Sequence, residues 1–147
     1  MTADDITGDD LGVVDTSVWN RLPRSPAVLA ALQSQSVKLK LCFVPTVILE
    51  IGFSARSKRD WNKAMGQIAS FDELPLRPQT REAAVRMQGL LWDKGMGRAV
   101  GALDVLTAAV ALDHGAIILH YDRDFETLAS VCPELRQEWI VPAGSVA

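Results

Sequence analysis

The segment Gly101–Phe125 reads GALDVLTAAVALDHGAIILHYDRDF and carries the clearest structural pattern of the chain. Residues 102–114 are apolar almost all round, and this pattern predicts a helix covered by neighbouring elements. A histidine followed by Gly115 is a signal for the end of a helix. Residues 116–121 form a short apolar run without alternation, which is typical of a central strand in a parallel sheet. The stretch therefore predicts a buried helix that leads directly into a buried strand.

Further strands and helices are expected to alternate along the rest of the chain. Strands are expected at 11–14, 39–44, 74–76 and 138–141, and helices at 27–35, 47–55, 60–71, 81–94 and 125–131. The expected N-caps of four helices are Ser25, Thr46, Thr80 and Asp124. Pro75 favours a position at the sheet edge for the third strand. The alternation predicts a three-layer α/β fold, with a central, mostly parallel sheet flanked by helices.

Composition indicates a single soluble globular domain. The chain has 147 residues, of which 48% are hydrophobic and 22% charged, and a net charge of −3. Four acidic residues lie in positions 1–10, which we interpret as a flexible acidic tail before a domain at 11–147. Cys42 and Cys132 lack metal-ligand spacing and are expected to be reduced core residues of a cytoplasmic protein. A signal peptide and a bilayer-spanning run are not evident, so no membrane association is expected.

Four acidic residues are placed where a parallel sheet collects ligands. Asp15 and Asp122 follow predicted strands, and ligands bind beyond the carboxyl ends of such strands. Glu50 lies one turn into the next helix, and Asp104 lies in the first turn of the central helix. If these carboxylates converge, their mutual repulsion calls for a hard cation such as Mg²⁺ or Mn²⁺. Such a site is suited to hydrolysis of a phosphodiester by water.

Each acid alone also has an ordinary structural interpretation. Asp15 is as well explained as a helix N-cap, and Glu50 as a solvated helix residue. The helix dipole accounts for Asp104, and turn chemistry accounts for Asp122. For Asp124, a helix cap is favoured over a primary metal ligand.

Four motifs together resemble the PIN domain and, within it, the VapC toxins of bacterial toxin–antitoxin systems. They are the tetrapeptide VDTS around Asp15, LE with the following SAR around Glu50, DVLTAA from Asp104, and HYDRDF around Asp122. Each motif alone is weakly specific, whereas four acids in this order are strongly specific. The segment EWIVPAG near the end of the chain resembles the ending of one bacterial subgroup. The resemblance covers roughly residues 13–144.

The resemblance implies a Mg²⁺-dependent endoribonuclease that acts on RNA, forms a homodimer and is held inactive by a cognate antitoxin protein. Carried over to this sequence, the catalytic carboxylates are Asp15, Glu50, Asp104 and Asp122. The implied metal ligands are Asp15, Asp104 and Asp122, with Asp124 as a further candidate.

Several polar residues are candidates for contacts with substrate. Thr16 and Ser17 are expected to hold a phosphate or metal-bound water through their hydroxyls. Arg56 and Arg59 either follow an RNA backbone or contact an acidic partner, and a solvated face explains them equally well. For Thr107, a bond to a backbone carbonyl of its own helix competes with a role in the site.

Other residues are given structural roles. We expect His120 to be a hydrogen-bonded core histidine rather than a catalytic base, and Trp61 to pack in the core. A dimer is expected through the helix at 80–94, whose apolar face carries Met87 and Leu91 with Ala84, beside Trp92. An amphipathic antitoxin segment is expected near the helices of Glu50 and Trp61, and to reach the carboxylates with a basic residue.

Two other functions compete with this interpretation. A phosphoaspartyl hydrolase of the haloacid dehalogenase kind requires a second acid two residues after the first, where this chain has Ser17. A PIN-like module that binds RNA or protein without catalysis would be favoured by a missing acid. All four acids are present.

Overall fold

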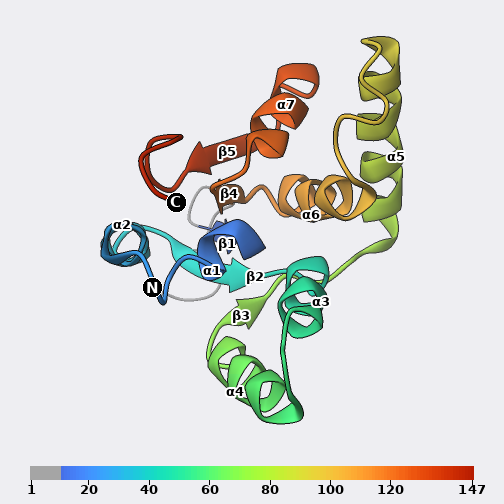
Figure 1. The fold of residues 1–147 in the computed structure, drawn as a ribbon. Coiled ribbons are helices and arrows are strands. Elements are labelled where there is room, and N and C mark those ends of the chain that lie inside the picture. The colour runs from blue at the N-terminus through green and yellow to red at the C-terminus, as the bar shows by residue number, and fades with distance from the viewer. Residues whose placement is uncertain (1–10) are drawn as a thin grey trace.

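The structure is a computed structural model that describes residues 11–147 as one α/β unit (Figure 1). Within these residues, five strands form a single sheet in the order β3-β2-β1-β4-β5, and every neighbouring pair is parallel. The strands are β1 (Leu11–Val14), β2 (Lys40–Phe43), β3 (Asp72–Glu73), β4 (Ile117–His120) and β5 (Arg136–Trp139). The predicted fold class is confirmed, and the sheet is parallel throughout. The acidic tail expected at 1–10 lies outside the described residues.

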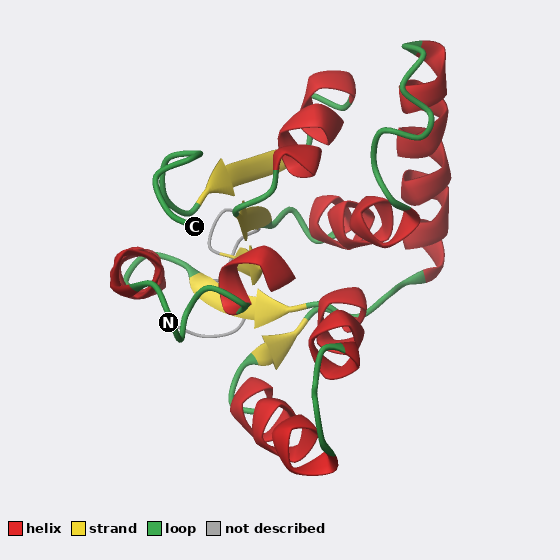
Figure 2. Ribbon diagram, in the orientation of Figure 1, coloured by secondary structure: helices red, strands yellow, loops and turns green. Residues whose placement is uncertain are grey.

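In the described part of the chain, seven helices connect and cover these strands (Figure 2). They are α1 (Thr16–Trp19), α2 (Pro26–Ser36), α3 (Pro45–Phe53), α4 (Lys58–Ile68), α5 (Pro78–Asp93), α6 (Ala102–Asp113) and α7 (Arg123–Val131). Helix α6 packs against α3, α5 and α7, so it lies at the centre of the helical layer. Among the described residues, no helix combines the length and the apolar character that crossing a membrane requires.

The segment Gly101–Phe125 forms the elements that it predicts. Helix α6 buries a continuous run from Thr107 to Ala111. The chain then turns at Gly115, whose φ of 67° is a left-handed conformation that glycine adopts without strain. Strand β4 follows at the centre of the sheet, between β1 and β5. A strand paired on both sides and covered by helices is buried on both faces, which explains why its apolar run does not alternate.

The predicted N-caps were correct at Ser25 and wrong at the other three helices. Ser25 Oγ accepts the N–H of Val28 at 3.2 Å. Helices α3 and α5 begin at Pro45 and Pro78, before Thr46 and Thr80, because proline is pre-organised for the first helical position.

Both threonine hydroxyls and the last cap have other partners. Thr46 Oγ1 lies 2.5 Å from Thr107 Oγ1, so the hydroxyl of Thr107 is bonded to a side chain of another helix, a partner that neither sequence interpretation of Thr107 includes. Thr80 Oγ1 accepts the backbone N–H of Arg77. Helix α7 is capped by Asp122, whose carboxylate accepts the N–H of Asp124.

The third and the last strands are displaced from their predicted positions. Strand β3 ends at Glu73, and the N–H of Leu74 makes one more bond, 2.9 Å long, to the carbonyl of Phe43. Pro75 has no N–H and cannot continue the ladder, so the predicted strand at 74–76 does not form. The predicted edge position is confirmed, because β3 is the outermost strand. The last strand begins at Arg136, two residues before the predicted start.

The burial of core residues tests two further predictions. Cys42 and Cys132 are free and buried, as expected. Met87 and Leu91 are fully buried, so this face of α5 is already used inside the protomer. The expectation that it is left over for a dimer was therefore wrong. The exposed apolar residues of α5 are Val85 and Trp92.

Candidate active site

The carboxyl ends of β1 and β4 bring two acidic segments together. The strands are paired with Val14 opposite Leu119, and the N–H of Asp15 continues the ladder to the carbonyl of Leu119 at 3.1 Å. Asp15 and Asp122 therefore leave the sheet at the same edge, as the sequence predicts. Asp15 is only 3% exposed, which is unusual for a carboxylate.

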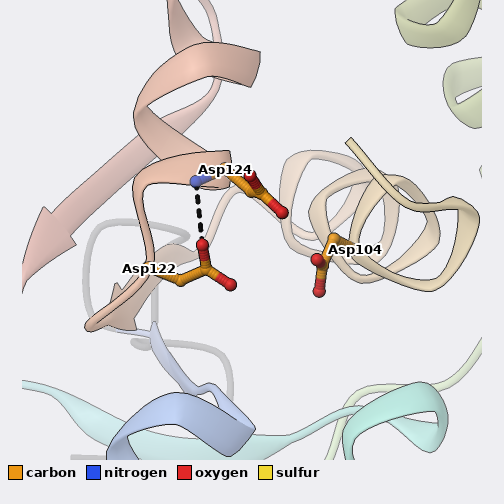
Figure 3. Close-up of side chains that lie close together, drawn as sticks. All are labelled: Asp104, Asp122 and Asp124. Carbon is orange, nitrogen blue, oxygen red and sulfur yellow. Dashed lines mark hydrogen bonds between the residues drawn. The ribbon is translucent and has the colours of Figure 1, made fainter. Parts of the chain in front are cut away.

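Three carboxylates gather beside this edge (Figure 3). Asp104 comes from the first turn of α6, whereas Asp122 and Asp124 come from the start of α7. One oxygen from each lies within 4.8 Å of the others. Asp124, which the sequence favoured as a helix cap, is thus a member of the cluster. The cap is Asp122, whose Oδ1 accepts the N–H of Asp124 at 2.9 Å.

The charges of five acids act on one another. Burial raises the pKa of Asp104 from 3.8 to about 7, and the charges of Asp15, Asp122, Glu50 and Asp124 add to this rise. Burial also raises the pKa of Asp15 and of Glu50, with Asp122 contributing in both cases. The pKa of Asp124 rises through burial and the charge of Asp122. The site therefore combines desolvation with like-charge repulsion, and both effects disfavour ionisation.

Two buried carboxylate oxygens have no hydrogen-bond partner among the described residues. They are Asp15 Oδ1 and Glu50 Oε1, and both are buried. Buried acceptors ordinarily have a donor or a cation beside them. An oxygen-rich cluster with unmatched negative charge fits a hard divalent cation such as Mg²⁺ or Mn²⁺. The residues that could hold it are Asp104, Asp122 and Asp124, with Asp15 and Glu50 adjoining.

The hydroxyl of Ser17 holds two parts of the site together. Its Oγ donates to Asp15 Oδ2 at 2.6 Å and accepts the backbone N–H of Tyr121 at 2.8 Å. This is a structural role, which sequence reasoning missed, and phosphate binding by Ser17 stays a prediction. The D-x-S pattern, which places a serine two residues after the acid, was the available signal. Thr16 Oγ1 is buried without a partner in the described chain.

His120 is a fully buried, hydrogen-bonded core residue, as expected. Its Nε2 lies 2.6 Å from Gln137 Oε1, and its ring packs against Phe125 and Trp139. Burial is the main cause that lowers the pKa of His120, which keeps the ring neutral. Gln137 was missed because it belongs to β5, and no local pattern connects it to the acids.

The outer wall of the site is apolar. A hollow of about 600 Å³ beside Glu50 is lined by Leu49, Phe53 and Leu103 together with Thr16, Asn20 and Ser54. Phe53 is 92% exposed and Leu49 72% exposed, so large side chains face solvent next to buried carboxylates. A second hollow of about 530 Å³ continues over Leu49 and Phe53 to Trp61. We call these two hollows together the α3 groove.

The structure places Trp61 and the two candidate arginines on the outside of this region. Trp61 is 39% exposed, with Lys58 Nζ 4.0 Å from the centre of its ring, so the prediction of core packing was wrong. The indole lies on Gly52, where an added Cβ would be 2.9 Å from Trp61 Nε1. Arg56 lines a smaller hollow with Trp19 and Asp60. Arg59 is exposed in the first turn of α4.

Comparison with known proteins agrees with this geometry. The family model of the PIN domain matches residues 12–131. Ribonuclease VapC51 of Mycobacterium tuberculosis is 36% identical over 135 residues, which are 91% of this chain and 96% of that protein. Ribonuclease VapC21 of the same organism is 38% identical over 66% of this chain and 70% of its own length.

The fold also resembles a solved toxin–antitoxin complex. The structure of VapBC2 from Rickettsia felis, bound to a DNA fragment from its promoter, contains a chain that superposes with a TM-score of 0.74. The match covers 87% of this chain and 97% of that one at 14% identity, so this comparison concerns the fold alone. The family match and the identity to VapC51 go further: the chain belongs to the PIN-domain family and, within it, to the VapC group.

Proposed function

We propose that this protein is a Mg²⁺-dependent endoribonuclease, the toxin of a toxin–antitoxin pair whose activity inhibits translation and growth in the cytoplasm until its antitoxin neutralises it. The observation that carries the proposal is the cluster of Asp104, Asp122 and Asp124, whose oxygens lie within 4.8 Å. Burial and, after it, repulsion by the other acids raise the pKa of Asp104 to about 7, which is the environment that a bound cation would relieve. The names of the VapC relatives supply the reaction class.

Each acid has a stated part in this proposal. Asp104, Asp122 and Asp124 would hold the cation, and Asp15 would complete its surroundings. A bound Mg²⁺ would neutralise charge on the phosphate and activate water. Ser17 keeps the carboxylate of Asp15 in place through a 2.6 Å hydrogen bond. Glu50, with one buried oxygen unpaired, faces the hollow in which the substrate phosphate would lie.

The test is cleavage of RNA by the purified protein. We expect total RNA incubated with the protein and Mg²⁺ to gain new defined ends, and EDTA to abolish them. The matched control is Asp104→Asn, which has nearly the same shape and lacks the charge. RNA that is bound and never cut under any divalent metal would contradict catalysis and would favour a binding module.

The α3 groove is the surface proposed for the antitoxin. It lies beside the acids and exposes Leu49, Phe53 and Leu103. An amphipathic segment would bury these side chains, and an arginine on it would reach the carboxylates as a charge-assisted partner. Copurification with the antitoxin followed by crosslinking tests this placement. Crosslinks confined to the opposite face, around α2, would refute it.

A homodimer is proposed through the exposed side of α5. Val85 and Trp92 are 55% and 59% exposed on this helix. The Trp92 ring is backed by Gly97, where even one added carbon would overlap it, so the indole lies against its own loop. Light scattering should give twice the mass of the chain, and Val85→Glu should reduce it. A monomer at tens of micromolar would contradict the dimer.

A further inference from the structure

The two backbone amides that follow β4 are held by side chains. The ladder of β4 ends with the carbonyl of Leu119, which accepts from Asp15, and that of His120, which accepts from Ile140. Beyond this point the N–H of Tyr121 donates to Ser17 Oγ at 2.8 Å. The N–H of Asp122 donates to Nδ1 of His120 at 3.1 Å. Side chains thus accept these two backbone N–H groups, which no neighbouring strand binds, at the point where the acidic cluster begins.

The contacts of His120 define its protonation. A backbone N–H can only donate, so Nδ1 must present its lone pair to Asp122. The ring hydrogen of the neutral imidazole is then on Nε2, which donates to Gln137 Oε1 at 2.6 Å. The rings of Phe125 and Trp139, centred 5.2 and 5.1 Å away, restrict the plane of the imidazole. Both nitrogens are used, and the side chain is fully buried.

This arrangement fixes Asp122 from two sides. Its backbone N–H is held by His120, and its Oδ1 is held by the N–H of Asp124 at the start of α7. The remaining oxygen, Oδ2, is the one left for the cluster with Asp104 and Asp124 (Figure 3). A rotation of the backbone at Asp122 would move this oxygen, because the carboxylate is only two bonds from the Cα atom.

We propose that His120 is a positioning residue: locked by Gln137 as the Nε2–H tautomer, it holds the backbone of Asp122 so that the carboxylate of Asp122 stays in the cluster. The inference rests on the proposed function, since a metal-binding role for Asp122 gives the positioning its purpose. Residues that orient metal ligands typically change metal affinity by about 10- to 100-fold when replaced.

Two substitutions of His120 separate this role from simple packing. In His120→Asn the amide Oδ1 occupies the place of Nδ1 and can still accept the N–H of Asp122. In His120→Gln the amide nitrogen occupies the place of Nε2 and can still donate to Gln137, whereas the acceptor for Asp122 is lost. Both variants remove the imidazole ring from its contacts with Phe125 and Trp139, so they serve as matched controls for each other.

The probe is Mn²⁺ titrated into the full-length metal-free protein, with free Mn²⁺ measured by electron paramagnetic resonance. We expect the dissociation constant of His120→Gln to rise about tenfold or more, and that of His120→Asn to stay within about threefold of wild type. In the metal-free proteins, hydrogen exchange at the Asp122 amide should be slow in wild type and His120→Asn and faster in His120→Gln.

Equal Mn²⁺ affinities of the two variants would overturn the inference, whether both are weakened or both are unchanged. So would equal exchange of the Asp122 amide in both. A wild-type protein that binds no Mn²⁺ would refute the metal-dependent activity itself, and the positioning role with it. RNA cleavage by wild type together with equal affinities of the variants would overturn the role of His120 alone.

Discussion

The two ends of α6 carry one aspartate each, and the two residues have opposite electrostatic properties. Asp104 in the first turn has a pKa raised to about 7, through burial and four neighbouring acids. Asp113 in the last turn has a lowered pKa, because Arg77 Nε lies 2.7 Å from its Oδ2. The helix dipole alone would stabilise a negative charge at the first position and destabilise it at the second. Burial together with the neighbouring acids outweighs the dipole at Asp104, and the bond from Arg77 outweighs it at Asp113.

The two ends of α6 differ in the source of the positive charge that compensates the aspartate. Asp113 has its cation within the chain, since Arg77 binds both its carboxylate and its carbonyl oxygen. Asp104 faces other carboxylates, and in the proposed function the charge that compensates it is that of a bound cation. A structural ion pair and a functional site can thus be told apart on one helix by where the compensating charge comes from.

The largest expected effect is that of Asp104→Asn on activity. The amide keeps the shape of the side chain and removes one charge from the cluster. Cleavage of RNA with Mg²⁺ should fall by at least about 100-fold, because the phosphate and water lose their positioning. The measurement is an initial rate on a defined RNA. Full activity of this variant would show that Asp104 is an ordinary first-turn residue.

Mg²⁺ should stabilise wild type more than Asp104→Asn. At a concentration 100 times the dissociation constant, a ligand that binds only the folded state adds about 2.7 kcal/mol to the free energy of unfolding. Melting curves with Mg²⁺ and with EDTA measure this difference. In EDTA the variant should melt no lower than wild type, because one of several like charges is gone. Equal Mg²⁺ shifts for both proteins would place the cation elsewhere.

Stability without metal should fall as pH rises through the range between the two pKa values of Asp104. Its pKa is about 7 in the folded state, against an ordinary value of 3.8 for an aspartate, so the folded state holds more protons in this window. The free energy of unfolding therefore decreases with rising pH from about 4 to about 7. Asp104→Asn should flatten this slope, and chemical denaturation at several pH values tests it. A slope that is identical in the variant would contradict the assignment.

At the other end of the helix, Arg77→Ala should cost stability and leave metal binding unchanged. The variant removes charge-assisted hydrogen bonds to Asp113, and we expect a loss of about 1–2 kcal/mol. The value is kept low because the Arg77 side chain is 40% exposed. Denaturant unfolding measures the loss, and the Mg²⁺ shift in melting temperature serves as the control. A weakened Mg²⁺ shift would show that the two ends are coupled.

The smallest effect is expected between the two ends, at the neutral pair of Thr46 and Thr107. Thr46→Val leaves the buried hydroxyl of Thr107 without its partner, which should cost about 1 kcal/mol. The double variant, in which Thr107 also becomes valine, should lose less than the sum of the two single variants. Additive losses in denaturant unfolding would mean that the hydroxyls do not act as a pair.

The sequence predicted the parts of the fold that rest on local patterns. The helix and strand on either side of Gly115 were predicted correctly, because apolar periodicity and a glycine stop are local signals. The caps at Thr46 and Thr80 were wrong because proline one or two residues earlier sets the first helical position. The prediction of a strand at 74–76 was wrong because it relied on the two apolar residues around a proline. The strand forms instead at the charged residues Asp72–Glu73, which carry no apolar pattern.

The parts of the site that follow from the sheet topology or from a helix end were also predictable from the sequence. The edge shared by Asp15 and Asp122 follows from a parallel sheet, and Asp104 follows from its place in the first turn. The inclusion of Asp124 depends on how α7 lies against α6, which no local pattern contains. The partners Ser17–Tyr121 and His120–Gln137 join segments far apart in the chain or in different strands. Their pairing is a property of the assembled sheet.

The edges of the sheet have a consequence for how copies of this protein can associate. One edge is β3, which offers only Asp72–Glu73, with Lys40 paired to Asp72 and a proline shortly after. The other edge is β5, which carries Arg136 and Glu138. Short, charged edges are poor templates for strand addition. The described sheet is therefore protected against growth from chain to chain, and contact between copies is left to the helices, where the interface can be specific and closed.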